Sequence, residues 1–375
     1  MDLDRRLIRN VDWILVATTF ALVGFGFVAI YSATFALVPS DPFYYVKRQA
    51  LGAVVGVVSA AFAVAIDYRA WSRFVRLIYG ATVLLLAVVT VMAPEIMGAG
   101  RWIALGPVQF QPSEFAKIAL IVTLAHHLAE KERVDSPGQL LSPLAHVAIP
   151  MVLILLQPDL GTALVFVGIL FGMLYVRGVP FRYIAALGAG GLVAFGLAAF
   201  VSMKGWLPLL KEYQLRRLFV FLDPYSDRTG AGWNVIQSMI AVGSGGFFGK
   251  GLFSGSQTQL DFLPARHTDF IFSVIAEELG FLGAFLLLAA YFFLICRGVW
   301  LMSAAKDQFG ALLIIGVLSM LLFHVLINVG MTLGIMPVTG LPLPFASSGG
   351  SSLVTNLIGI GIILNVHMRR HKILF

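Results

Sequence analysis

Charge is scarce in this chain of 375 residues. Asp, Glu, Lys and Arg together make up 12% of it, about half the charged share of an ordinary soluble domain. Hydrophobic residues make up 59%, and the mean hydropathy is +0.90. Too little polar surface remains to cover a water-soluble globule of this size, so the composition indicates a polytopic membrane protein.

Cysteine is nearly absent, and nucleotide-binding motifs are missing. The single Cys296 excludes an internal disulfide, and its apolar neighbours predict an ordinary buried thiol. No glycine-rich loop ends in the Gly-Lys-Ser/Thr of a P-loop, so an energy-rich group would have to arrive attached to a substrate. The net charge of +7 would suggest nucleic acid in a soluble chain. Here the basic residues lie mostly in short loops between apolar runs, so orientation in a membrane explains them and no nucleic-acid partner is expected.

Hydropathy rises in ten runs along the chain. They predict transmembrane helices over residues 13–32, 49–66, 77–92, 114–128, 143–156, 160–176, 183–203, 271–295, 309–333 and 351–366. The fourth run is short and less apolar, and the first is interpreted as a retained helix because no cleavable signal peptide is evident. The expected fold is an all-α polytopic membrane protein. It is a single domain over residues 1–375, with one long extracytoplasmic loop at about 204–270, between spans seven and eight.

Lys and Arg residues set the expected orientation. They gather in both tails and in the loops after the second, fourth, sixth and eighth runs, whereas the opposite short loops hold only Lys47, Arg48 and Arg101. Because basic residues are retained on the cytoplasmic side, both termini are expected there. The unusual polar residues then fall at the outer end, which predicts chemistry on the outer face.

Candidate substrate-binding residues follow from this placement. Glu114 and Lys117 share one face of the fourth run at i, i+3 spacing, where ionisable residues are functional candidates by default. Simple neutralisation of one charge by the other explains the pair as well. The other candidates at this end are Arg48, Arg101, Trp102, Asp159, His267 and Thr268.

Arg216 and Arg217 are further candidates for binding an anion. They lie in an amphipathic stretch, residues 206–220, which either grips an anionic lipid headgroup or merely lies in the interface. On the eighth run, at least one of Glu277 and Glu278 should face the protein interior, since a carboxylate in contact with lipid is costly.

A small polar run is a candidate phosphate site. It precedes a helix N-terminus, where backbone amides favour a phosphate, although a turn with an N-cap explains the same residues. Its members are Ser347, Ser348, Gly349 and Gly350. The glycine-rich residues 243–246 allow a similar choice between an anion-binding nest and tight packing.

Asp269 is the candidate catalytic base. It lies where the long loop meets the eighth run, and the three apolar residues after it would partly desolvate its carboxyl group, which raises a carboxyl pKa. Positive charge on Arg266 and His267 would oppose that rise. The alternative is that Asp269 caps the helix that begins there.

Several motifs occur in order along the chain. They are Arg101-Trp102-Ile103 with Gln111-Pro112-Ser113-Glu114-Phe115-Ala116-Lys117, His267-Thr268-Asp269-Phe270-Ile271-Phe272 with Glu277-Glu278-Leu279-Gly280, and Met336-Pro337-Val338-Thr339-Gly340-Leu341-Pro342-Leu343-Pro344-Phe345. Together they resemble the SEDS family of bacterial shape, elongation, division and sporulation membrane proteins. The long loop is most similar to the elongation branch. Ala265 and Ser348 depart from the pattern, since they stand where Glu and Tyr are common.

The resemblance implies a peptidoglycan glycosyltransferase that polymerises lipid II on the outer face of the bacterial cytoplasmic membrane. Undecaprenyl pyrophosphate would be the leaving group and a β-1,4 glycan the inverted product. A class B penicillin-binding protein would be the partner that supplies the transpeptidase. Within the family's motif, Asp269 matches the essential aspartate. A divalent cation, Mg²⁺ or Mn²⁺, on the pyrophosphate fits this chemistry, although the sequence offers no metal cluster.

Two other function classes stay open. A lipid II flippase would also use intramembrane Glu and Lys residues, but no inverted repeat is evident and the polar residues favour one face. A non-catalytic scaffold that recruits a transpeptidase is the third reading. The division or sporulation branch of the same family is a further alternative.

Overall fold

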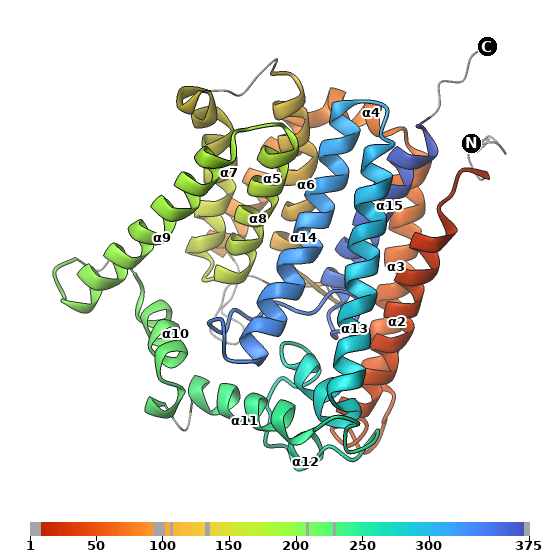
Figure 1. The fold of residues 1–375 in the computed structure, drawn as a ribbon, viewed down its shortest axis with the longest axis vertical. Coiled ribbons are helices and arrows are strands. Elements are labelled where there is room, and N and C mark those ends of the chain that lie inside the picture. Colours follow the sequence, from red (N-terminus) through yellow and green to blue (C-terminus); the bar gives the residue numbers. More distant parts are fainter. Residues whose placement is uncertain are drawn as a thin grey trace.

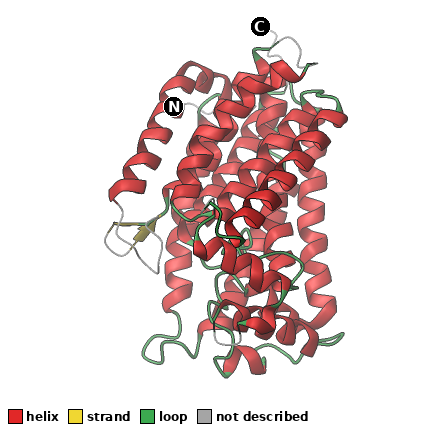
Figure 2. Ribbon diagram, turned by 90° about the vertical axis from the view of Figure 1, so that its left-hand side faces the viewer, coloured by secondary structure: helices red, strands yellow, loops and turns green. Residues whose placement is uncertain are grey.

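The computed structural model describes residues 9–92, 102–105, 108–131, 136–207, 210–227 and 230–370. Long helices run side by side in one bundle (Figures 1 and 2). These helices are α2 (Trp13–Thr34), α3 (Tyr44–Ala65), α5 (Val75–Met92), α6 (Pro112–Ala129), α7 (Pro137–Leu156), α8 (Leu160–Val176), α9 (Phe181–Met203), α13 (Ile271–Ser303), α14 (Gln308–Thr332) and α15 (Gly350–Met368). The shorter elements are α4 (Tyr68–Trp71), η1 (Ser72–Phe74), β1 (Ile103–Leu105), β2 (Val108–Phe110), α10 (Glu212–Leu222), η2 (Pro224–Ser226), α11 (Ala231–Ser244) and α12 (Ser256–Gln259).

Each of the ten predicted spans coincides with a helix. The end of α13 differs most, at Ser303 instead of residue 295, and α7 begins at Pro137 instead of Pro143. Ser136 and Gln139 form a capping box there, with Pro137 at the first helical position, and these are strong helix starts. Pro143 and Pro150 lie inside the helix, as membrane helices tolerate when neighbouring groups satisfy the freed backbone.

Eight helices in the described part of the chain are long and apolar enough to cross a membrane. They include neither α8, which is apolar but short, nor α6, which carries the buried Glu114 and Lys117. The chain is therefore a multi-pass membrane protein. The expectation of an all-α fold has one exception, an antiparallel hairpin of β1 and β2 that pairs Ile103 with Phe110 (Figure 2). Apolar, β-branched and aromatic residues on either side of a Gly-Pro pair in the sequence favour it.

The centre of the bundle is formed by α14 and α15. In the most apolar window of α15, 94% of residues are buried, against 11% for α9. Small residues let α3 approach α15 closely, because a Cβ on Gly52 would lie 3.1 Å from the Cα of Gly350 and a Cβ on Gly361 would lie 2.8 Å from the carbonyl oxygen of Ala60. The two backbones are therefore in near contact.

The periphery of the bundle faces outward. In Figure 1, α9 diverges from the other helices, and α10, α11 and α12 lie across the end of the bundle opposite the start of α2 and the end of α15. Cys296 on α13 is exposed, so the prediction of a buried thiol was wrong. Apolar neighbours in sequence do not imply burial inside the protein where lipid can cover an apolar helix face.

One helix, α13, is interrupted at Gly280, whose φ of 67° favours glycine. The glycine-rich segment 245–251 packs into this break. Lys250 N donates to the carbonyl of Glu277 at 3.0 Å, and Phe281 N donates to that of Gly246 at 2.9 Å. A Cβ on Gly249 would lie 2.2 Å from the carbonyl oxygen of Glu278. Tight packing therefore accounts for Gly245 and Gly249, whose added Cβ atoms would lie 2.0 Å and 2.2 Å from backbone carbonyl oxygens of α13.

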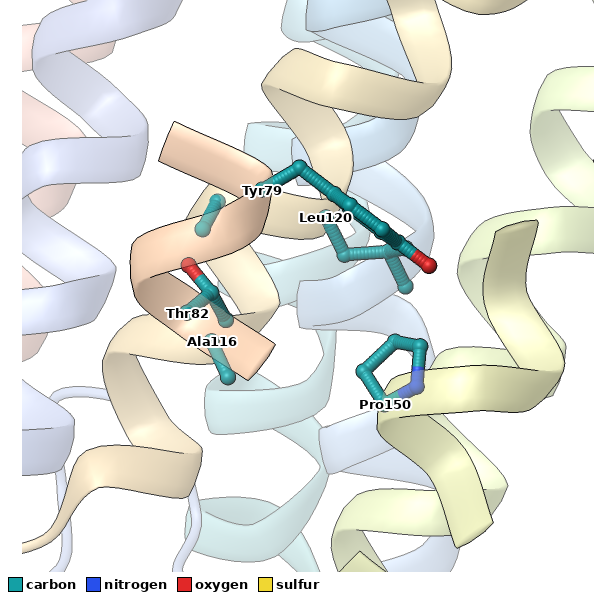
Figure 3. Close-up of a pocket in the computed structure, with 6 residues that line it drawn as sticks. Tyr79, Thr82, Ala116, Leu120 and Pro150 are labelled. Carbon is teal, nitrogen blue, oxygen red and sulfur yellow. The ribbon is translucent and has the colours of Figure 1, made fainter. Parts of the chain in front are cut away.

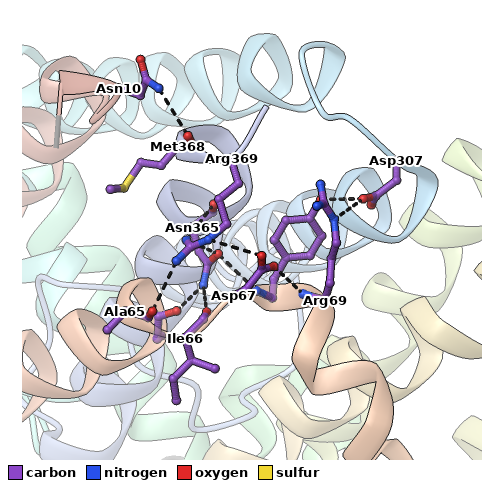
Figure 4. A network of polar contacts seen from close by, with 11 residues as sticks. Asn10, Ala65, Ile66, Asp67, Arg69, Asp307, Asn365, Met368 and Arg369 are labelled. Carbon is purple, nitrogen blue, oxygen red and sulfur yellow. Dashed lines mark hydrogen bonds and ion pairs between the residues drawn. The ribbon is translucent and has the colours of Figure 1, made fainter. Parts of the chain in front are cut away.

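A polar network joins the connections between helices at the end of the bundle opposite α11 and α12 (Figure 4). Asn365 near the end of α15 donates to the carbonyl of Ile66 at 2.5 Å and accepts a hydrogen bond from Tyr68 N at 3.3 Å. Asp307, just before α14, accepts hydrogen bonds from the Tyr68 hydroxyl at 2.6 Å and from Arg69 Nε at 3.0 Å. Three connections that are far apart in the sequence are therefore held together.

Removing the Asp307 carboxylate should lower stability. Its Oδ1 also accepts a hydrogen bond from Gly310 N at 2.8 Å and so caps α14. Asp307→Ala should cost about 1–3 kcal/mol at neutral pH, and Asp307→Asn, which keeps a capping oxygen, should cost less. Thermal unfolding of the purified protein in detergent measures both, and an unchanged Tm for Asp307→Ala would contradict this role.

The contribution of Asp307 should also depend on pH. Burial disfavours its charged form, but hydrogen bonds from Tyr68, Gly310 and Arg69 outweigh burial and lower the pKa of this carboxyl. Because the folded pKa lies below the unfolded value of about 4, the contribution is present above that pH and is lost as pH falls through the folded pKa. The Tm difference between wild type and Asp307→Ala should therefore shrink on acidification.

Candidate functional site

The segment His267–Asp269 is held by groups from distant parts of the chain. Ser348 N donates to the carbonyl of His267 at 2.8 Å, and Ser347 Oγ donates to that of Thr268 at 2.6 Å. Asn328 Nδ2 on α14 donates to the carbonyl of Asp269 at 2.8 Å. The three consecutive backbone carbonyls of this segment are thus each held by a hydrogen bond from a distant part of the chain. The structure brings together two of the motif groups that the sequence singled out.

Gln49 on α3 completes this arrangement. Its Nε2 donates to the carbonyl of Ser347 at 3.0 Å, and its Oε1 accepts a hydrogen bond from Gly349 N at 3.1 Å. Arg48, the neighbouring candidate, is exposed and lies over the Tyr44 ring at 5.8 Å. The residues before α15 are therefore tied to α3 as well as to the entry of α13.

Asp269 is half-buried at the start of α13. Phe270 occupies the N-cap position of that helix and makes no side-chain cap, so Asp269 is not the N-cap residue that the alternative supposed. Phe270, Ile271 and Phe272 are all buried, and that they desolvate the Asp269 carboxyl group stays a prediction.

His267 is a neutral polar group in this site. Burial, helped by the charge of Arg266, lowers the pKa of His267 to about 4, so its imidazole is uncharged at physiological pH. Its ring centroid lies 4.5 Å from that of Tyr45, and its Nδ1 has no hydrogen-bond partner among the described residues. Arg266 instead donates to the carbonyl of Ala33 at 2.8 Å and pairs with Asp261. The opposing positive charge expected from His267 is therefore absent at this pH.

Glu114 and Lys117 form a buried ion pair in α6. Lys117 Nζ lies 2.7 Å from Glu114 Oε1 and 2.9 Å from His324 Nε2, while His324 Nδ1 lies 3.2 Å from the carbonyl of Pro342. Glu114 Oε2 has no hydrogen-bond partner within the described part of the chain. The two charges are paired with each other, as the alternative of simple neutralisation supposed. Through His324 the pair also connects α6 to α14 and to the segment before α15.

His324 and Asn328 were missed from the sequence. They lie one turn apart on α14, and Asn328 Nδ2 also donates to the carbonyl of Leu341 at 2.8 Å. A polar line therefore runs from Glu114 to the backbone of Asp269. The available signal was a His and an Asn at i, i+4 spacing within a run that is otherwise almost entirely apolar.

Asp159 acts as a junction between helices. Its carboxylate caps α8 by accepting from Thr162 N at 3.1 Å, and it accepts from Ser113 Oγ at 3.1 Å and Gln111 Nε2 at 3.3 Å. Gln111 N in turn donates to Ser351 Oγ at 3.2 Å. The residue is buried, and these bonds position the starts of α6, α8 and α15.

The remaining candidates are only partly gathered at this site. Arg217 Nη1 lies 3.5 Å from the carbonyl of Thr339, but Arg216 is exposed and pairs with Asp227 at 2.8 Å. The hydrogen bond from Arg216, against a smaller effect of burial, lowers the pKa of Asp227. Trp102 is half-buried before β1, and Arg101 lies outside the described residues.

The start of α15 is a turn with part of its amides already engaged. Ser348 N and Gly349 N donate within the protein, and Gly349 is an N-cap without a side-chain bond. An anion at this place would use the amides of the first turn, which begins at Gly350.

Glu277 and Glu278 are both buried, as expected for at least one of them. Glu277 accepts hydrogen bonds from Lys250 Nζ at 2.8 Å and Thr258 Oγ1 at 3.1 Å, and Glu278 accepts one from Ser32 Oγ at 2.6 Å. They anchor residues 250–258 of the long loop onto α13 and join α13 to α2. Over the ranges that the structure covers, no group of three or more His, Cys, Asp or Glu residues forms a candidate metal site, and the divalent cation stays a prediction.

Comparisons with known proteins agree with the motifs. The profile of the FtsW/RodA/SpoVE family, described as cell cycle proteins, matches residues 12–372. The chain is 39% identical over 363 residues to a probable peptidoglycan glycosyltransferase FtsW of Trichlorobacter lovleyi, covering 95% of this chain and 92% of that protein. It is 41% identical over 326 residues to the peptidoglycan glycosyltransferase MrdB of Escherichia coli K12, covering 87% and 85%.

Solved structures agree as well. A chain from a peptidoglycan synthase complex that coordinates polymerization and crosslinking superposes with a TM-score of 0.79 at 39% identity, over 96% of this chain and 99% of that one. The rod shape determining protein RodA of Thermus thermophilus gives 0.70 at 34% identity, over 96% and 98%. The resemblance seen in the sequence is confirmed, and the chain belongs to the SEDS family, the family of FtsW, RodA and SpoVE.

Proposed function

We propose that this protein is an inverting peptidoglycan glycosyltransferase that polymerises lipid II, with Asp269 as the catalytic base. The observation that carries the proposal is the fixed segment His267–Asp269, at the junction of the α13 entry, the turn before α15 and the polar line from Glu114. The names of the relatives support the activity. A site of this kind, where a carboxylate lies beside apolar residues and is positioned by a rigid shell, suits proton transfer.

The proposed topology has ten spans with both ends in the cytoplasm. The bias of Lys and Arg residues supports it, as does the arrangement in which α2 begins and α15 ends at one end of the bundle (Figure 1). Asn10 Nδ2 lies 3.4 Å from the carbonyl of Met368 at that end. Asp269 lies at the other end, which would face the outside of the cytoplasmic membrane.

The proposed reaction is a single displacement. A sugar hydroxyl of the acceptor attacks the anomeric carbon of the α-linked donor, the bond to undecaprenyl pyrophosphate breaks, and a β linkage forms. Asp269 takes the hydroxyl proton. Arg48 and Arg217, together with Arg101, are the candidates to stabilise the charge that develops on the pyrophosphate.

The buried Lys117 has a different proposed role. Its ammonium lies between Glu114 and His324, so it holds the site together more than it reaches toward bulk substrate. The neutral His267, with Nδ1 unpartnered among the described residues, is placed to form a hydrogen bond with the sugar.

A transpeptidase partner and a role in elongation extend the proposal. The structural relative from a synthase complex that couples polymerization to crosslinking supports a class B penicillin-binding protein as partner. The loop motifs and the relatives MrdB and RodA favour elongation, whereas the FtsW relative favours division. Expression of this chain in a strain depleted of its RodA-type protein, and in one depleted of its FtsW protein, distinguishes the two roles. Rescue of rod shape supports elongation, and rescue of septation supports division.

The flippase and scaffold readings make a different prediction. Purified protein in detergent, where no second leaflet exists, should convert lipid II into glycan visible on a gel, alone or with the partner. A flippase or a scaffold would leave lipid II unchanged.

Asp269→Asn should abolish most of this polymerisation. Loss of a general base lowers the rate by about 10²-fold or more, while the amide keeps the size of the side chain, so folding and partner binding should survive. Asp261→Asn is the matched control, because Asp261 is exposed and its ion pair among the described residues is with Arg266, and it should stay close to the wild-type rate. Near-normal synthesis by Asp269→Asn would move the base to Glu114 or Asp159.

The Glu114–Lys117 pair can be tested by charge reversal. Lys117→Met leaves a buried carboxylate without its cation and should cost about 3–5 kcal/mol of stability. The double variant Glu114→Lys with Lys117→Glu should recover much of the Tm but polymerise more slowly, because a carboxylate beside His324 would disturb the frame that holds the Asp269 backbone. Full activity in the double variant would show that the pair is only structural.

A further inference from the structure

Two prolines interrupt the backbone hydrogen bonds of α7. Because a proline has no amide hydrogen, it cannot donate to the carbonyl four residues earlier. Pro143 therefore leaves the carbonyl of Gln139 without its helical donor. Lys131 Nζ, which follows α6, donates to this carbonyl at 3.1 Å. Gln139 is exposed, so water can also satisfy the backbone at this first break.

The second break of α7 is held by a tyrosine from another helix. Pro150 leaves the carbonyl of His146 without its helical donor, and the Tyr79 hydroxyl on α5 donates to that carbonyl at 2.8 Å. The rings of Tyr79 and His146 also stack, with centroids 4.2 Å apart. One hydroxyl group thus replaces the missing amide of a buried proline.

The packing beside Pro150 leaves little room for a substitute donor. Tyr79 extends toward the part of α7 that carries Pro150, across a small space that Ala116 and Leu120 also border (Figure 3). This space has a volume of about 10 Å³, enough for about one water. Its lining is mostly apolar, whereas a buried water needs several polar partners. From this side, water does not readily replace the Tyr79 hydroxyl.

The other side of the break borders a larger cavity, the α5–α7 chamber. It has a volume of about 340 Å³ and lies between α5, α6 and α7. It is lined by Arg76, Tyr79, Thr123, His127, Glu130 and His146, among others. A close-packed interior leaves no space for a helix to move, whereas this chamber does. Its polar lining also suits water, which can donate to the carbonyl of His146 once that carbonyl leaves Tyr79.

The part of α7 after Pro150 is held to α5 by a different residue. Gln157, directly after the helix, is buried, and its Nε2 donates to the carbonyl of Leu86 at 2.9 Å and to Thr90 Oγ1 at 3.0 Å. Tyr79 and Gln157 therefore bind α7 to α5 on opposite sides of Pro150. Only the contact before the proline borders the open chamber.

We propose that α7 is hinged at Pro150 and that the Tyr79 hydroxyl is the clamp that keeps the hinge closed. In the open state, residues 137–149 move toward the α5–α7 chamber, and chamber water replaces Tyr79 on the carbonyl of His146. Residues 151–157 stay on α5. A proline break, one replaceable hydrogen bond and free space beside the moving part occur together here, and a few such positions are enough to absorb a hinge motion.

Spin-label distances in the purified full chain test this hinge. Cys296 is the single cysteine and is exposed on α13, so it carries the fixed label. The second label is placed by Leu141→Cys, before the hinge, or by Val152→Cys, after it, and both positions are exposed. Tyr79→Phe keeps the stacked ring and removes the donor. It should broaden or shift the distance distribution from position 141 by up to about 5 Å, because a bend of roughly 20° acts over about 13 Å of helix.

The distribution from position 152 should not change in the Tyr79→Phe variant. Pro150→Ala returns an amide that can donate to the carbonyl of His146, so in this background Tyr79→Phe should no longer change the distribution from position 141. Tyr175→Phe is the matched control, because Tyr175 is exposed on α8, and it should have no effect at either position.

Three results would overturn the proposal. They are an unchanged distribution from position 141 in Tyr79→Phe, an equal change at both label positions, and an undiminished effect of Tyr79→Phe in the Pro150→Ala background. The measurement does not use polymerisation, so its failure leaves the proposed glycosyltransferase activity untouched.

Discussion

The buried ammonium of Lys117 is the constraint on which the architecture depends. A cation buried in an apolar interior must be balanced by other groups of the protein, because its surroundings offer no compensating charge. Here Glu114 supplies the counter-charge at 2.7 Å and His324 lies at 2.9 Å. His324 needs a neighbour in turn, and the carbonyl of Pro342 provides it. These contacts hold α14 against α6 and hold the segment before α15 inside the bundle.

Non-helical backbone inside a bundle of this kind is stable only where protein groups form hydrogen bonds with its N–H and C=O groups. Gln49 bonds both Ser347 and Gly349, and Asn328 bonds Leu341, so side chains replace the hydrogen bonds that a helix would have formed. The break of α13 at Gly280 follows the same rule, since backbone amides of the outer loop fill it. The protein thus covers the non-helical segments near Asp269 with its own polar groups.

The sequence predicted what depends on local pattern. All ten apolar runs are helices, because apolarity over the length of a bilayer is a local property, and the paired polar motifs do meet around Asp269. The sequence pattern failed where the environment of a residue depends on which helix faces pack together. Cys296 lies on an outward face, and the roles of His324 and Asn328 follow only from their packing against α6 and the segment before α15.

The orientation of Asp269 shows why a rigid frame matters at this site. The residue follows a long loop, and loops usually position side chains less precisely than helices do. In this protein the carbonyls of His267, Thr268 and Asp269 are each fixed by a group from α14 or the turn before α15. The network that balances a charge in the membrane also holds this backbone, because Asn328 lies one turn from His324 on the same helix. The requirement to bury a cation and the requirement to orient a base are therefore met by one set of contacts.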